Sequence, residues 1–377
     1  MPAEWENYMI KKIGIECEPI ENDTWGVARL TSKLLEEISR RPELKNKFEF
    51  YLYFKSKIPD YSYLKNPIFK KKILKPPIIP ASFSLYYYVY LPIYLRFKRV
   101  DVMFFPNYML PLIFSGKSVV MLTDDVYYES RNQKLPLRYR LAYRVFAGWA
   151  AGHASQIMAI SETSKKELVK LFKIKPERIV VNHLGADVPA TQKTDNNNKY
   201  ILYAGQAFPR RHLKETILAF ENIASIFPDL KLIAIGPDKY ETPTISPLVS
   251  QVNGRLHREA VIHKDHVKDD ELADLYAGAK ALVYVSDREA FGLPPMEALS
   301  FGVPPVIADN ELGHELFGEY AFYSKSGEVD DIAETIGQAL TDNQKIDKIR
   351  SEGPEFVKKY NWKSFVDRFL KLIENDH

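Results

Sequence analysis

Short apolar runs alternate along this chain with longer segments in which apolar residues recur every three or four positions. The short runs are typical of buried strands, and the longer spacing is typical of helices with one buried face. In the first half, the pattern predicts strands at residues 10–15, 48–54, 100–105, 118–122 and 156–159, and helices at 27–39, 137–151 and 163–172. Strands that alternate with helices at this spacing indicate parallel βαβ units.

The alternation restarts after a polar, loop-like segment at residues 189–199, which we interpret as a linker. The second half is predicted to contain strands at 200–204, 230–235, 281–285 and 306–308, and helices at 213–226, 270–279, 294–301, 329–340 and 361–373. The fold class is therefore α/β, with two doubly wound domains across a cleft. Ligands are expected at the carboxyl ends of the strands.

Composition narrows the class of protein. A chain of 377 residues that is 46% hydrophobic and 27% charged can build two or three domains with sizeable cores. The single cysteine, Cys17, excludes a disulfide framework and a thiolate metal cluster, and it fits a reducing compartment. The start of the chain lacks the pattern of a secretion signal, and no apolar run has the length of a membrane-spanning helix. We therefore expect a cytoplasmic protein.

Charge is divided unevenly between the two halves. Residues 1–188 hold 30 Lys and Arg against 19 Asp and Glu, a net charge of +11, whereas residues 189–377 hold 22 against 30, a net charge of −8. The two values sum to the +3 of the whole chain. This asymmetry indicates an anionic partner for the first half, the alternative being an accidental drift of surface charge.

Residues 65–99 break the alternating pattern. Five lysines (Lys65, Lys70, Lys71, Lys72 and Lys75) precede the aromatic-rich stretch FSLYYYVYLPIYLRFKR at residues 83–99. A basic cluster beside an amphipathic aromatic segment is typical of peripheral contact with an anionic membrane surface. The alternative is a buried, tyrosine-rich helix that is broken at Pro92 and flanked by solvated lysines.

The segment SDREAFGLPPMEALSFGVPP, residues 286–305, carries the most specific chemical signal. It follows an apolar strand and enters a helix whose first turn holds two prolines, where proline is tolerated because the first amides have no partner within the helix. The amides of Phe291, Gly292 and Leu293 precede those prolines and are placed to meet a phosphate at the helix N-terminus. Glu289 and Glu297, eight positions apart, suit the hydroxyl groups on either side of a diphosphate.

The stretch EAFGLPPME resembles the Glu-x7-Glu donor-site signature of the retaining family-four glycosyltransferases, which have the two-Rossmann GT-B fold. The similarity extends over nearly the whole chain. It includes WGVAR (25–29), SQIMAISETSKKELV (155–169), VVNHLGAD (180–187), YAGQAFPRRHL (203–213) and VKDDELADLYAGAKALVYVS (267–286). The resemblance implies an acceptor-binding domain at residues 1–188, a nucleotide-sugar domain at 200–360 and a C-terminal helix, 361–377, that packs back towards the first domain.

The resemblance also implies roles for individual residues. Arg210 and Arg211 would grip the donor diphosphate, Glu289 would contact donor-sugar hydroxyls and Glu297 the ribose. Arg211 stands where the family usually has lysine, and the next residue, His212, where it has asparagine. The glycine and backbone positions that would complete the donor site are Gly26, Gly205, Val267, Phe291, Gly292 and Leu293. The alternative for the two glutamates is a pair of capping carboxylates favoured by the helix dipole.

The chain departs from the family after the predicted strand at 118–122. Family members often carry a His-Asp pair there, whereas this chain reads Thr123-Asp124-Asp125, and Thr123 or Asp124 takes the histidine position according to the alignment. We carry Asp124 forward as a catalytic candidate. Adjacent strand-end carboxylates point apart and no Asp-x-Asp is present, so we expect no metal site.

The sequence therefore predicts a retaining, metal-independent glycosyltransferase that takes its sugar from a nucleotide diphosphate-sugar and needs no other cofactor. The GLPP variant favours GDP-mannose over UDP-glucose. The expected acceptor is a glycan or lipid-linked glycan reached at the inner face of the membrane, and no nucleic-acid partner is expected. A sugar-nucleotide epimerase of the same fold and a nucleotide-binding homologue without turnover remain as alternatives.

Overall fold

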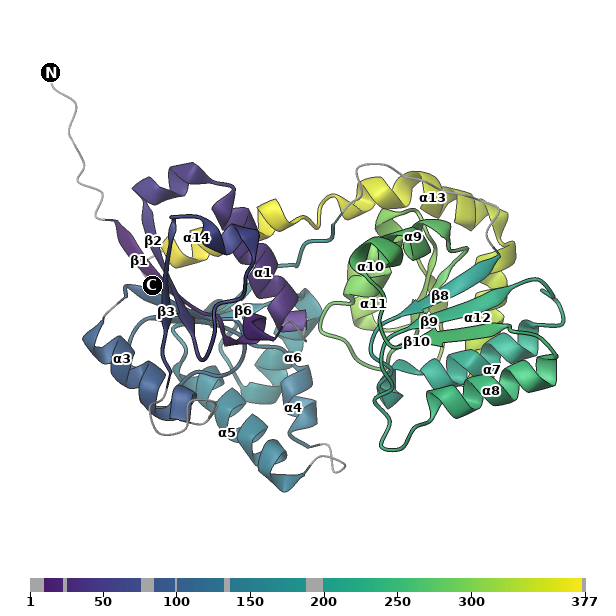
Figure 1. The fold of residues 1–377 in the computed structure, drawn as a ribbon, viewed down its shortest axis with the longest axis horizontal. Coiled ribbons are helices and arrows are strands. Elements are labelled where there is room, and N and C mark those ends of the chain that lie inside the picture. The colour runs from purple at the N-terminus through teal and green to yellow at the C-terminus, as the bar shows by residue number, and fades with distance from the viewer. Residues whose placement is uncertain are drawn as a thin grey trace, which may run out of the picture. The chain divides into compact units, whose positions relative to one another are not determined.

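The computed structural model describes residues 10–22, 26–75, 85–98, 100–131, 136–187 and 199–374. Trp25 and the predicted linker, apart from Lys199, lie outside these ranges. The chain divides into two compact units: Met1–Gly185 together with Trp362–His377, and Ala186–Asn361. Each unit contains one parallel sheet with helices packed against it (Figure 1). The predicted α/β class with two parallel sheets is thereby confirmed.

The sheet of the first unit has the strand order β3-β2-β1-β4-β5-β6-β7. Its strands are β1 (Lys11–Glu16), β2 (Phe48–Phe54), β3 (Phe69–Ile73), β4 (Val102–Phe105), β5 (Ser118–Met121), β6 (Gln156–Ala159) and β7 (Ile179–Val181). All neighbours are parallel; Ile13 of β1, for example, pairs with Phe50 on one side and Val102 on the other. The strand order reverses between β1 and β4, so the carboxyl ends of these two strands mark the expected ligand edge.

The helices of the first unit include the last helix of the chain. They are α1 (Gly26–Ser39), α3 (Leu91–Phe97), α4 (Asp125–Glu129), α5 (Leu137–His153), α6 (Glu162–Phe172) and α14 (Trp362–Glu374). The ring of Phe369 in α14 lies 4.8 Å from that of Phe104 in β4. Arg368 donates from Nε to the Asn182 side-chain oxygen at 2.8 Å. A side chain at Gly185 would overlap Trp362, so only glycine fits where the chain passes this helix.

The second unit repeats the doubly wound plan with the strand order β10-β9-β8-β11-β12-β13. The strands are β8 (Tyr200–Ala204), β9 (Lys231–Ile235), β10 (Val261–Lys264), β11 (Leu282–Tyr284), β12 (Pro305–Ala308) and β13 (Phe322–Ser324). The helices are α7 (Leu213–Ile223), α8 (Ile245–Leu256), α9 (Asp269–Gly278), α10 (Leu293–Ser300), α11 (Glu311–Phe317), α12 (Val329–Thr341) and α13 (Asn343–Val357). Helices α7, α8 and α12 pack together, and α10 packs against α9 and α13 (Figure 1).

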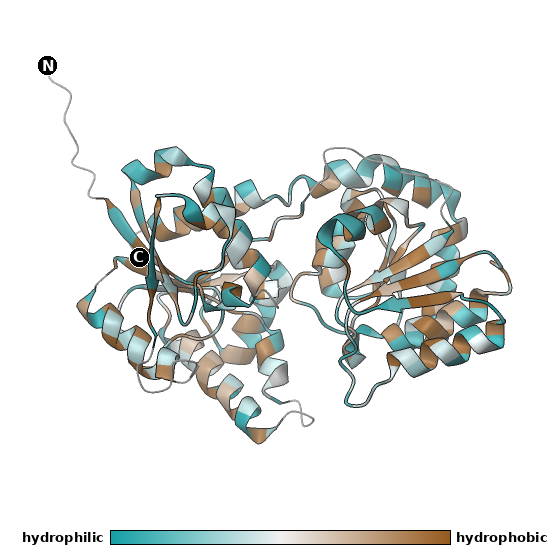
Figure 2. Ribbon diagram, viewed as in Figure 1, coloured by the Kyte–Doolittle hydropathy of each residue, from teal (hydrophilic) through white to brown (hydrophobic). Residues whose placement is uncertain are grey.

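Burial follows the apolar pattern that predicted the strands. Central strands are brown along their length in Figure 2, and most helices show a brown face and a teal face. The four strands that the sequence pattern missed are β3, β7, β10 and β13, which are the outer strands of the two sheets. An outer strand has a neighbour on one side only and needs no continuous apolar run; β3, for instance, exposes Lys70, Lys71, Lys72 and Ile73.

The aromatic segment is a helix that continues across its proline. Tyr86–Tyr90 form a π-helical turn, and α3 begins at Leu91 directly before Pro92. Proline lacks an amide hydrogen and its ring crowds the preceding turn, so the wider π turn accommodates it. Tyr86 and Tyr87 are buried in the core, whereas Phe97 is 78% exposed. The predicted break at Pro92 is therefore wrong, and the segment is only partly core. No helix in the described ranges is long and apolar enough to cross a membrane.

Candidate functional site

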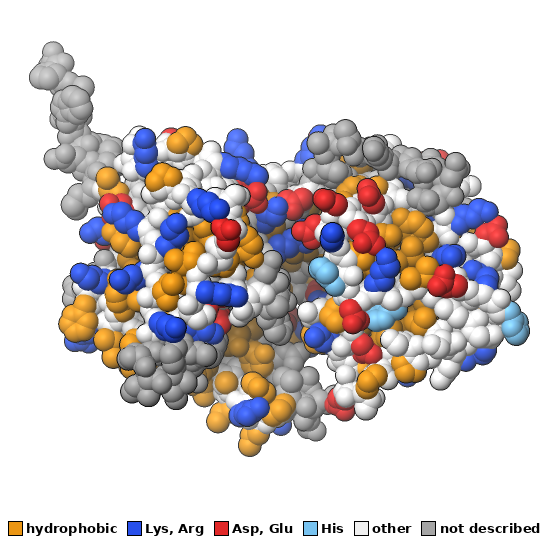
Figure 3. Space-filling view, in the orientation of Figure 1, with side chains coloured by type: hydrophobic (Ala, Val, Ile, Leu, Met, Phe, Trp, Pro, Cys, Tyr) orange, Lys and Arg blue, Asp and Glu red, His pale blue; other side chains and the backbone are white. Residues whose placement is uncertain are grey.

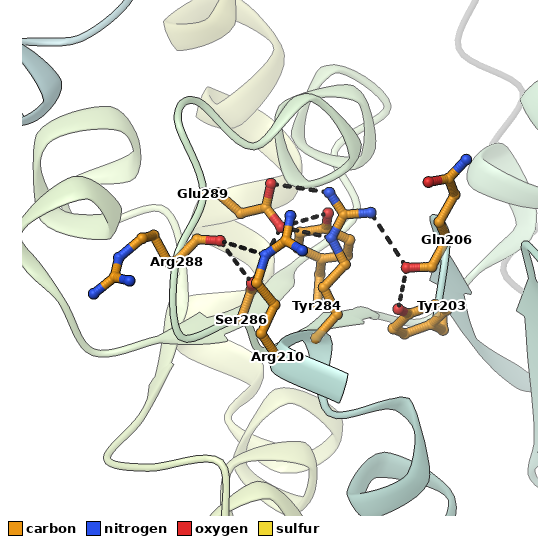
Figure 4. A network of polar contacts seen from close by, with 8 residues as sticks. Tyr203, Gln206, Arg210, Tyr284, Ser286, Arg288 and Glu289 are labelled. Carbon is orange, nitrogen blue, oxygen red and sulfur yellow. Dashed lines mark hydrogen bonds and ion pairs between the residues drawn. The ribbon is translucent and has the colours of Figure 1, made fainter. Parts of the chain in front are cut away.

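The candidate site of the second unit lies at the carboxyl ends of β8 and β11. These strands are neighbours, and the strand order reverses between them. The loops that follow them therefore run in opposite directions, which leaves room for a ligand. The loop after β8 carries Gly205 and the 3-10 turn Pro209–Arg211, and the loop after β11 leads into α10. This topology explains why Arg211 and Glu289, far apart in sequence, form hydrogen bonds. Figure 4 shows Glu289, Ser286 and Tyr284 close to Arg210 in this network.

Arg211 and Glu289 form a two-point ion pair. Arg211 donates from Nε to Oε1 of Glu289 at 2.6 Å and from Nη2 to Oε2 at 3.0 Å. Both side chains are mostly buried, with 15% and 16% exposure. Burial opposes the charge on Arg211, but Tyr284 and Glu289 outweigh it and hold the pKa of the guanidinium above its ordinary value. The planar fork of arginine matches a carboxylate in this arrangement, which an ammonium group cannot reproduce.

Two further donors fix the Glu289 carboxylate. The hydroxyls of Tyr284 and Ser286 each donate to Oε1 at 3.1 Å. Burial and, next, the charge of Glu289 raise the pKa of Tyr284 well above its ordinary value, so the phenol keeps its proton and remains a donor. Within the described ranges Oε2 accepts only from Arg211, and a carboxylate oxygen has room for a second donor such as a sugar hydroxyl.

Arg210 lies beside this pair with its charged end available. Its Nε donates to the Arg288 backbone oxygen at 3.3 Å, and its guanidinium lies over the ring of Phe208 at 4.7 Å. In the part of the chain that the structure describes, Nη1 and Nη2 of Arg210 make no hydrogen bond. The loops are also joined through their backbones, since the Asp287 amide donates to the Arg210 oxygen at 2.9 Å. Arg210 therefore offers an anion two donors from a held position.

The backbone around β8 can adopt its path only with glycine. Gly205 has a φ of 143° and Gly236, after β9, a φ of 135°. A side chain at Gly236 would overlap the Gly205 carbonyl oxygen, so the ends of the two strands approach each other closely. The Arg211 guanidinium extends over this junction and donates from Nη1 to the Gln206 oxygen at 3.2 Å.

His212 connects the two site loops. Its backbone is left-handed, with φ 47°, and its Nε2 lies 2.7 Å from the Asp287 side-chain oxygen. Nδ1 lies 3.6 Å from the Glu215 carboxylate in α7. The carboxylate of Glu215, and then that of Asp287, raise the pKa of His212 to about 9. The side chain is therefore an imidazolium near neutral pH, next to the two arginines.

The predicted phosphate-facing residues begin α10. Gly292 precedes this helix with a φ of 91°, and Leu293 is its first residue. Phe291 is buried, its ring 5.9 Å from that of Tyr360. Glu297 is also buried and accepts a hydrogen bond from the Tyr276 hydroxyl at 3.0 Å.

The remaining predicted residues lie on other elements of the two units. Val267 is buried in the loop between β10 and α9, at the outer side of the second sheet. In the first unit, Gly26 is the first residue of α1, and a side chain there would meet nothing within 4 Å. Asp124 is buried at the start of α4, after β5. No group of three or more His, Cys, Asp and Glu side chains within the described ranges is arranged to hold a metal ion.

Sequence reasoning missed several partners of the predicted site. Tyr284 and Ser286 stand two positions apart at the end of β11, and the alternation of side chains along a strand places both on one face. The two-residue spacing could therefore have predicted that both hydroxyls reach the same site. Of the partners of His212, Glu215 lies only three residues along the chain in α7, whereas Asp287 comes from the loop after β11, and Tyr276 meets Glu297 from another helix. Such contacts arise only from the fold.

Comparison with solved structures identifies the fold as that of the GT-B glycosyltransferases. The chain superposes on WaaG, a glycosyltransferase involved in lipopolysaccharide biosynthesis, with a TM-score of 0.70 and 17% identity, covering 96% of this chain and 99% of that one. It superposes on Anabaena HepE in complex with UDP and glucose with a TM-score of 0.72 and 16% identity, covering 97% and 100%. Similarity at this level of identity shows the fold alone.

Sequence comparison adds a family domain. Residues 187–356, in the second unit, match the family described as Glycosyl transferases group 1. O-antigen chain mannosyltransferase B of Escherichia coli is 29% identical over 235 residues, which are 59% of this chain and 61% of that protein. A GDP-mannose:cellobiosyl-diphosphopolyprenol alpha-mannosyltransferase of Xanthomonas oryzae is 24% identical over 221 residues, 57% of each chain. The chain thus spans about three fifths of the length of these two relatives.

Proposed function

We propose that this protein is a retaining glycosyltransferase that moves a sugar from a nucleotide diphosphate-sugar to an acceptor hydroxyl without a metal ion. The observation that carries the proposal is the meeting of Arg210, Arg211 and Glu289 at the carboxyl ends of β8 and β11. Two cations beside a fixed carboxylate suit a ligand that carries a diphosphate next to a hydroxyl-rich ring. The group 1 domain at residues 187–356 supports this use of the site.

Each part of the donor has a partner in this proposal. Arg210 and Arg211, with the amides at the start of α10, bind the diphosphate. Oε2 of Glu289 accepts a hydrogen bond from a sugar hydroxyl while Arg211 keeps the carboxylate in place. Glu297, held by Tyr276, accepts from the ribose. Gly26 and Asp124, in the first unit, keep the roles that the family resemblance implies for them, Asp124 that of orienting the transferred sugar.

The reaction forms one glycosidic bond and breaks one. The acceptor oxygen attacks the anomeric carbon from the face that the diphosphate leaves, so the configuration is retained. The bond from that carbon to the terminal phosphate oxygen breaks with its electron pair, and the acceptor proton passes to the departing phosphate. Arg210 and Arg211 stabilise the negative charge that develops there. In this proposal Glu289 binds a sugar hydroxyl through Oε2 and forms no covalent intermediate.

The names of the relatives favour a mannosyl donor and an acceptor on a lipid. One relative is named for GDP-mannose and a diphosphopolyprenol acceptor, and the other for an O-antigen chain. HepE has been solved in complex with UDP-glucose, so UDP-glucose is the second donor to compare with GDP-mannose. We propose GDP-mannose as the donor and a lipid-linked glycan as the acceptor, reached at the cytoplasmic face of the membrane.

A donor assay with and without acceptor tests the proposal. Thermal unfolding in the presence of GDP-mannose or UDP-glucose identifies the nucleotide, since a ligand at 100 times its dissociation constant adds about 2.7 kcal/mol of stability. Donor turnover is expected only when a lipid-linked glycan is added, and it should survive EDTA. Donor consumed without acceptor would indicate an epimerase or hydrolase, and binding without any turnover a non-catalytic homologue. Loss of activity in EDTA would contradict metal independence.

The two glutamates should separate binding from turnover. Glu297→Gln keeps the shape that Tyr276 contacts but removes the charge, and it should raise the dissociation constant for nucleotide roughly tenfold. Glu289→Gln should leave nucleotide affinity nearly unchanged and lower kcat by about a hundredfold, because it loosens the sugar at the reacting carbon. Tyr276→Phe is the control for the structural role of Glu297. Wild-type kinetics in both glutamine variants would disprove the donor site.

A further inference from the structure

The positive charge of the first half is concentrated in one continuous stretch. Residues 61–161 hold 14 Lys and Arg against four Asp and Glu, a net charge of +10. The first 188 residues as a whole carry +11, so the remainder of that half is almost neutral. The first unit therefore has a basic part built from a limited set of elements, among which are α3 and α5.

The same stretch exposes large apolar side chains on three segments. On the helical segment that ends with α3, Val89, Ile93 and Phe97 recur every four residues and are exposed. On α5 the exposed apolar residues are Leu137, Tyr139, Leu141 and Val145. Leu112 and Ile113 are exposed on the loop after β4, Ile113 by 65%. A single exposed Leu or Ile is common, but the four-residue spacing places the exposed apolar residues of each helix on one face, as is typical of an interaction surface.

Arginines and lysines accompany these apolar side chains. Arg96 and Lys98 are exposed at the end of α3, and Arg138 and Arg144 on α5. The Arg138 guanidinium lies 4.8 Å from the ring of its exposed neighbour Tyr139. Neither α3 nor α5 contains an acidic residue. Figure 3 shows hydrophobic and basic side chains together where Figure 1 draws α5.

The helices that carry this surface share one core. Tyr88, before α3, stacks on Phe146 of α5 with ring centroids 5.1 Å apart. Tyr108, in the loop after β4, lies 5.4 Å from Tyr143 of α5. The buried faces of all three segments therefore hold their exposed faces in a common frame, without rearrangement on docking.

We infer that the exposed faces of α3 and α5, with the loop at Leu112 and Ile113, form a docking surface for an anionic lipid bilayer. Apolar side chains enter the headgroup boundary, while the arginines meet lipid phosphates. A second copy of the same basic surface would repel itself, which is why an anionic bilayer is the occupant that the charge selects. The biological role of this surface rests on the proposed lipid-linked acceptor. Binding to vesicles can be measured independently of that acceptor.

This surface differs from the lysine cluster expected from the sequence. Lys70 forms an ion pair with Glu49 at 2.8 Å, and Lys71 donates to the Leu64 backbone oxygen at 2.6 Å. Both lie on the outer strand β3, where exposed lysines also discourage pairing with other strands. Of the sequence-predicted segment, the exposed face of α3 remains in the surface.

Co-sedimentation with vesicles tests the inference on the full chain. Wild-type protein should sediment with vesicles of phosphatidylglycerol and phosphatidylcholine and stay in solution with phosphatidylcholine alone or in about 0.5 M salt, where screening is short-ranged. Arg138→Glu with Arg144→Glu should lower partitioning at least tenfold, and so should Phe97→Ser with Leu137→Ser. The matched controls are Lys45→Glu with Lys371→Glu, which change charge equally elsewhere on the first unit, and Ile226→Ser, at an apolar residue of the second unit that is 70% exposed.

Each outcome separates this inference from the proposed function. Wild-type protein that stays in the supernatant with anionic vesicles overturns the inference, as does equal loss of binding in the lysine controls or loss only in Lys70→Glu with Lys72→Glu. A concentration-dependent dimer that the serine variants dissociate, with no vesicle binding, would assign the surface to a second copy. The donor-induced thermal shift, measured in every variant, should remain. If that shift is missing in wild type while vesicle binding persists, the proposed function fails and the docking surface stands.

Discussion

Among single residues, His212 is the one whose environment departs most from what the sequence suggested. The resemblance places an asparagine there, yet the structure holds a histidine between the carboxylates of Glu215 and Asp287. The left-handed backbone at this position suits asparagine as well as histidine. The difference between the two residues is therefore the charge, which ties the loop after β8 to the loop after β11 and adds a cation beside Arg210 and Arg211.

Replacing His212 by asparagine should make stability less dependent on pH. The folded pKa of His212 is about 9, above the roughly 6.5 of an unfolded histidine, so its stabilising charge is fully present below about pH 6.5 and is lost as the pH rises through 9. At pH 6, His212→Asn should cost on the order of 1–2 kcal/mol after allowance for solvent screening. The difference from wild type, measured by urea unfolding, should vanish by about pH 10.

A histidine elsewhere provides the control for this titration. His257 ends α8 with the same left-handed backbone, at φ 52°, and within the described ranges it makes no ion pair. His257→Asn is the control for replacing a histidine at a left-handed position outside the site, measured by the same urea unfolding. A pH-independent effect of His212→Asn would show that its contacts to the two carboxylates do not depend on charge.

At the scale of elements, the site depends on how α10 begins. Gly292 has a left-handed backbone directly before the helix, and the nearest atom to a side chain there, Pro295 Cγ, is 3.8 Å away. The residue at position 292 is therefore limited by its backbone conformation and not by the space around it. An L-residue in this region costs roughly 1–2 kcal/mol. In the proposed function, the amides of this loop bind the diphosphate.

Gly292→Ala should lower both stability and donor affinity. The expected loss is about 1–2 kcal/mol in urea unfolding, with a weaker thermal shift by the donor because the amides turn away. Gly254→Ala is the matched control: it lies in the last turns of α8 with open space around it, and alanine should leave stability unchanged or raise it by up to about 1 kcal/mol. If Gly292→Ala were as stable as wild type, the observed turn would not be required.

At the scale of the whole molecule, the chain returns to its first unit after completing the second. Helix α14 follows Asn361 and packs on α1, with its residues Phe365 and Phe369 fully buried. Its Asp367 pairs with Arg41 at 2.5 Å. The first unit therefore depends for its core on the last residues of the described chain, although its other elements precede the second unit.

Phe369→Ala should destabilise the first unit alone. Loss of this buried ring is expected to cost about 3–5 kcal/mol of unfolding free energy. In calorimetry, the transition that nucleotide raises should keep its midpoint, and the other should fall. Phe220→Ala, at a ring equally buried in α7 of the second unit, should do the reverse. A single transition shifted equally by both variants would show that the units unfold together.

The sequence by itself determined the architecture and most of the candidate site. Central strands are buried on both faces, so they need continuous apolar runs, and those runs are visible in the chain. The site residues Arg210, Arg211, Glu289 and Glu297 were visible because each follows such a strand or begins a helix, where local sequence dictates local structure. The outer strands β3, β7, β10 and β13 escaped notice because a strand with one neighbour needs no such run.

Only the tertiary structure decided which side chains meet. The pair of Arg211 and Glu289 arises because β8 and β11 are neighbours in the sheet, a fact about strand order that no local pattern encodes. The charge of His212 depends on carboxylates from two separate segments. Of the aromatic stretch at 83–99, Tyr86 and Tyr87 are buried in the core that they share with Tyr53 of β2, whereas Ile93 and Phe97 are exposed. Composition predicted an unusual surface there, but burial is set by long-range contacts, which only the folded chain brings together.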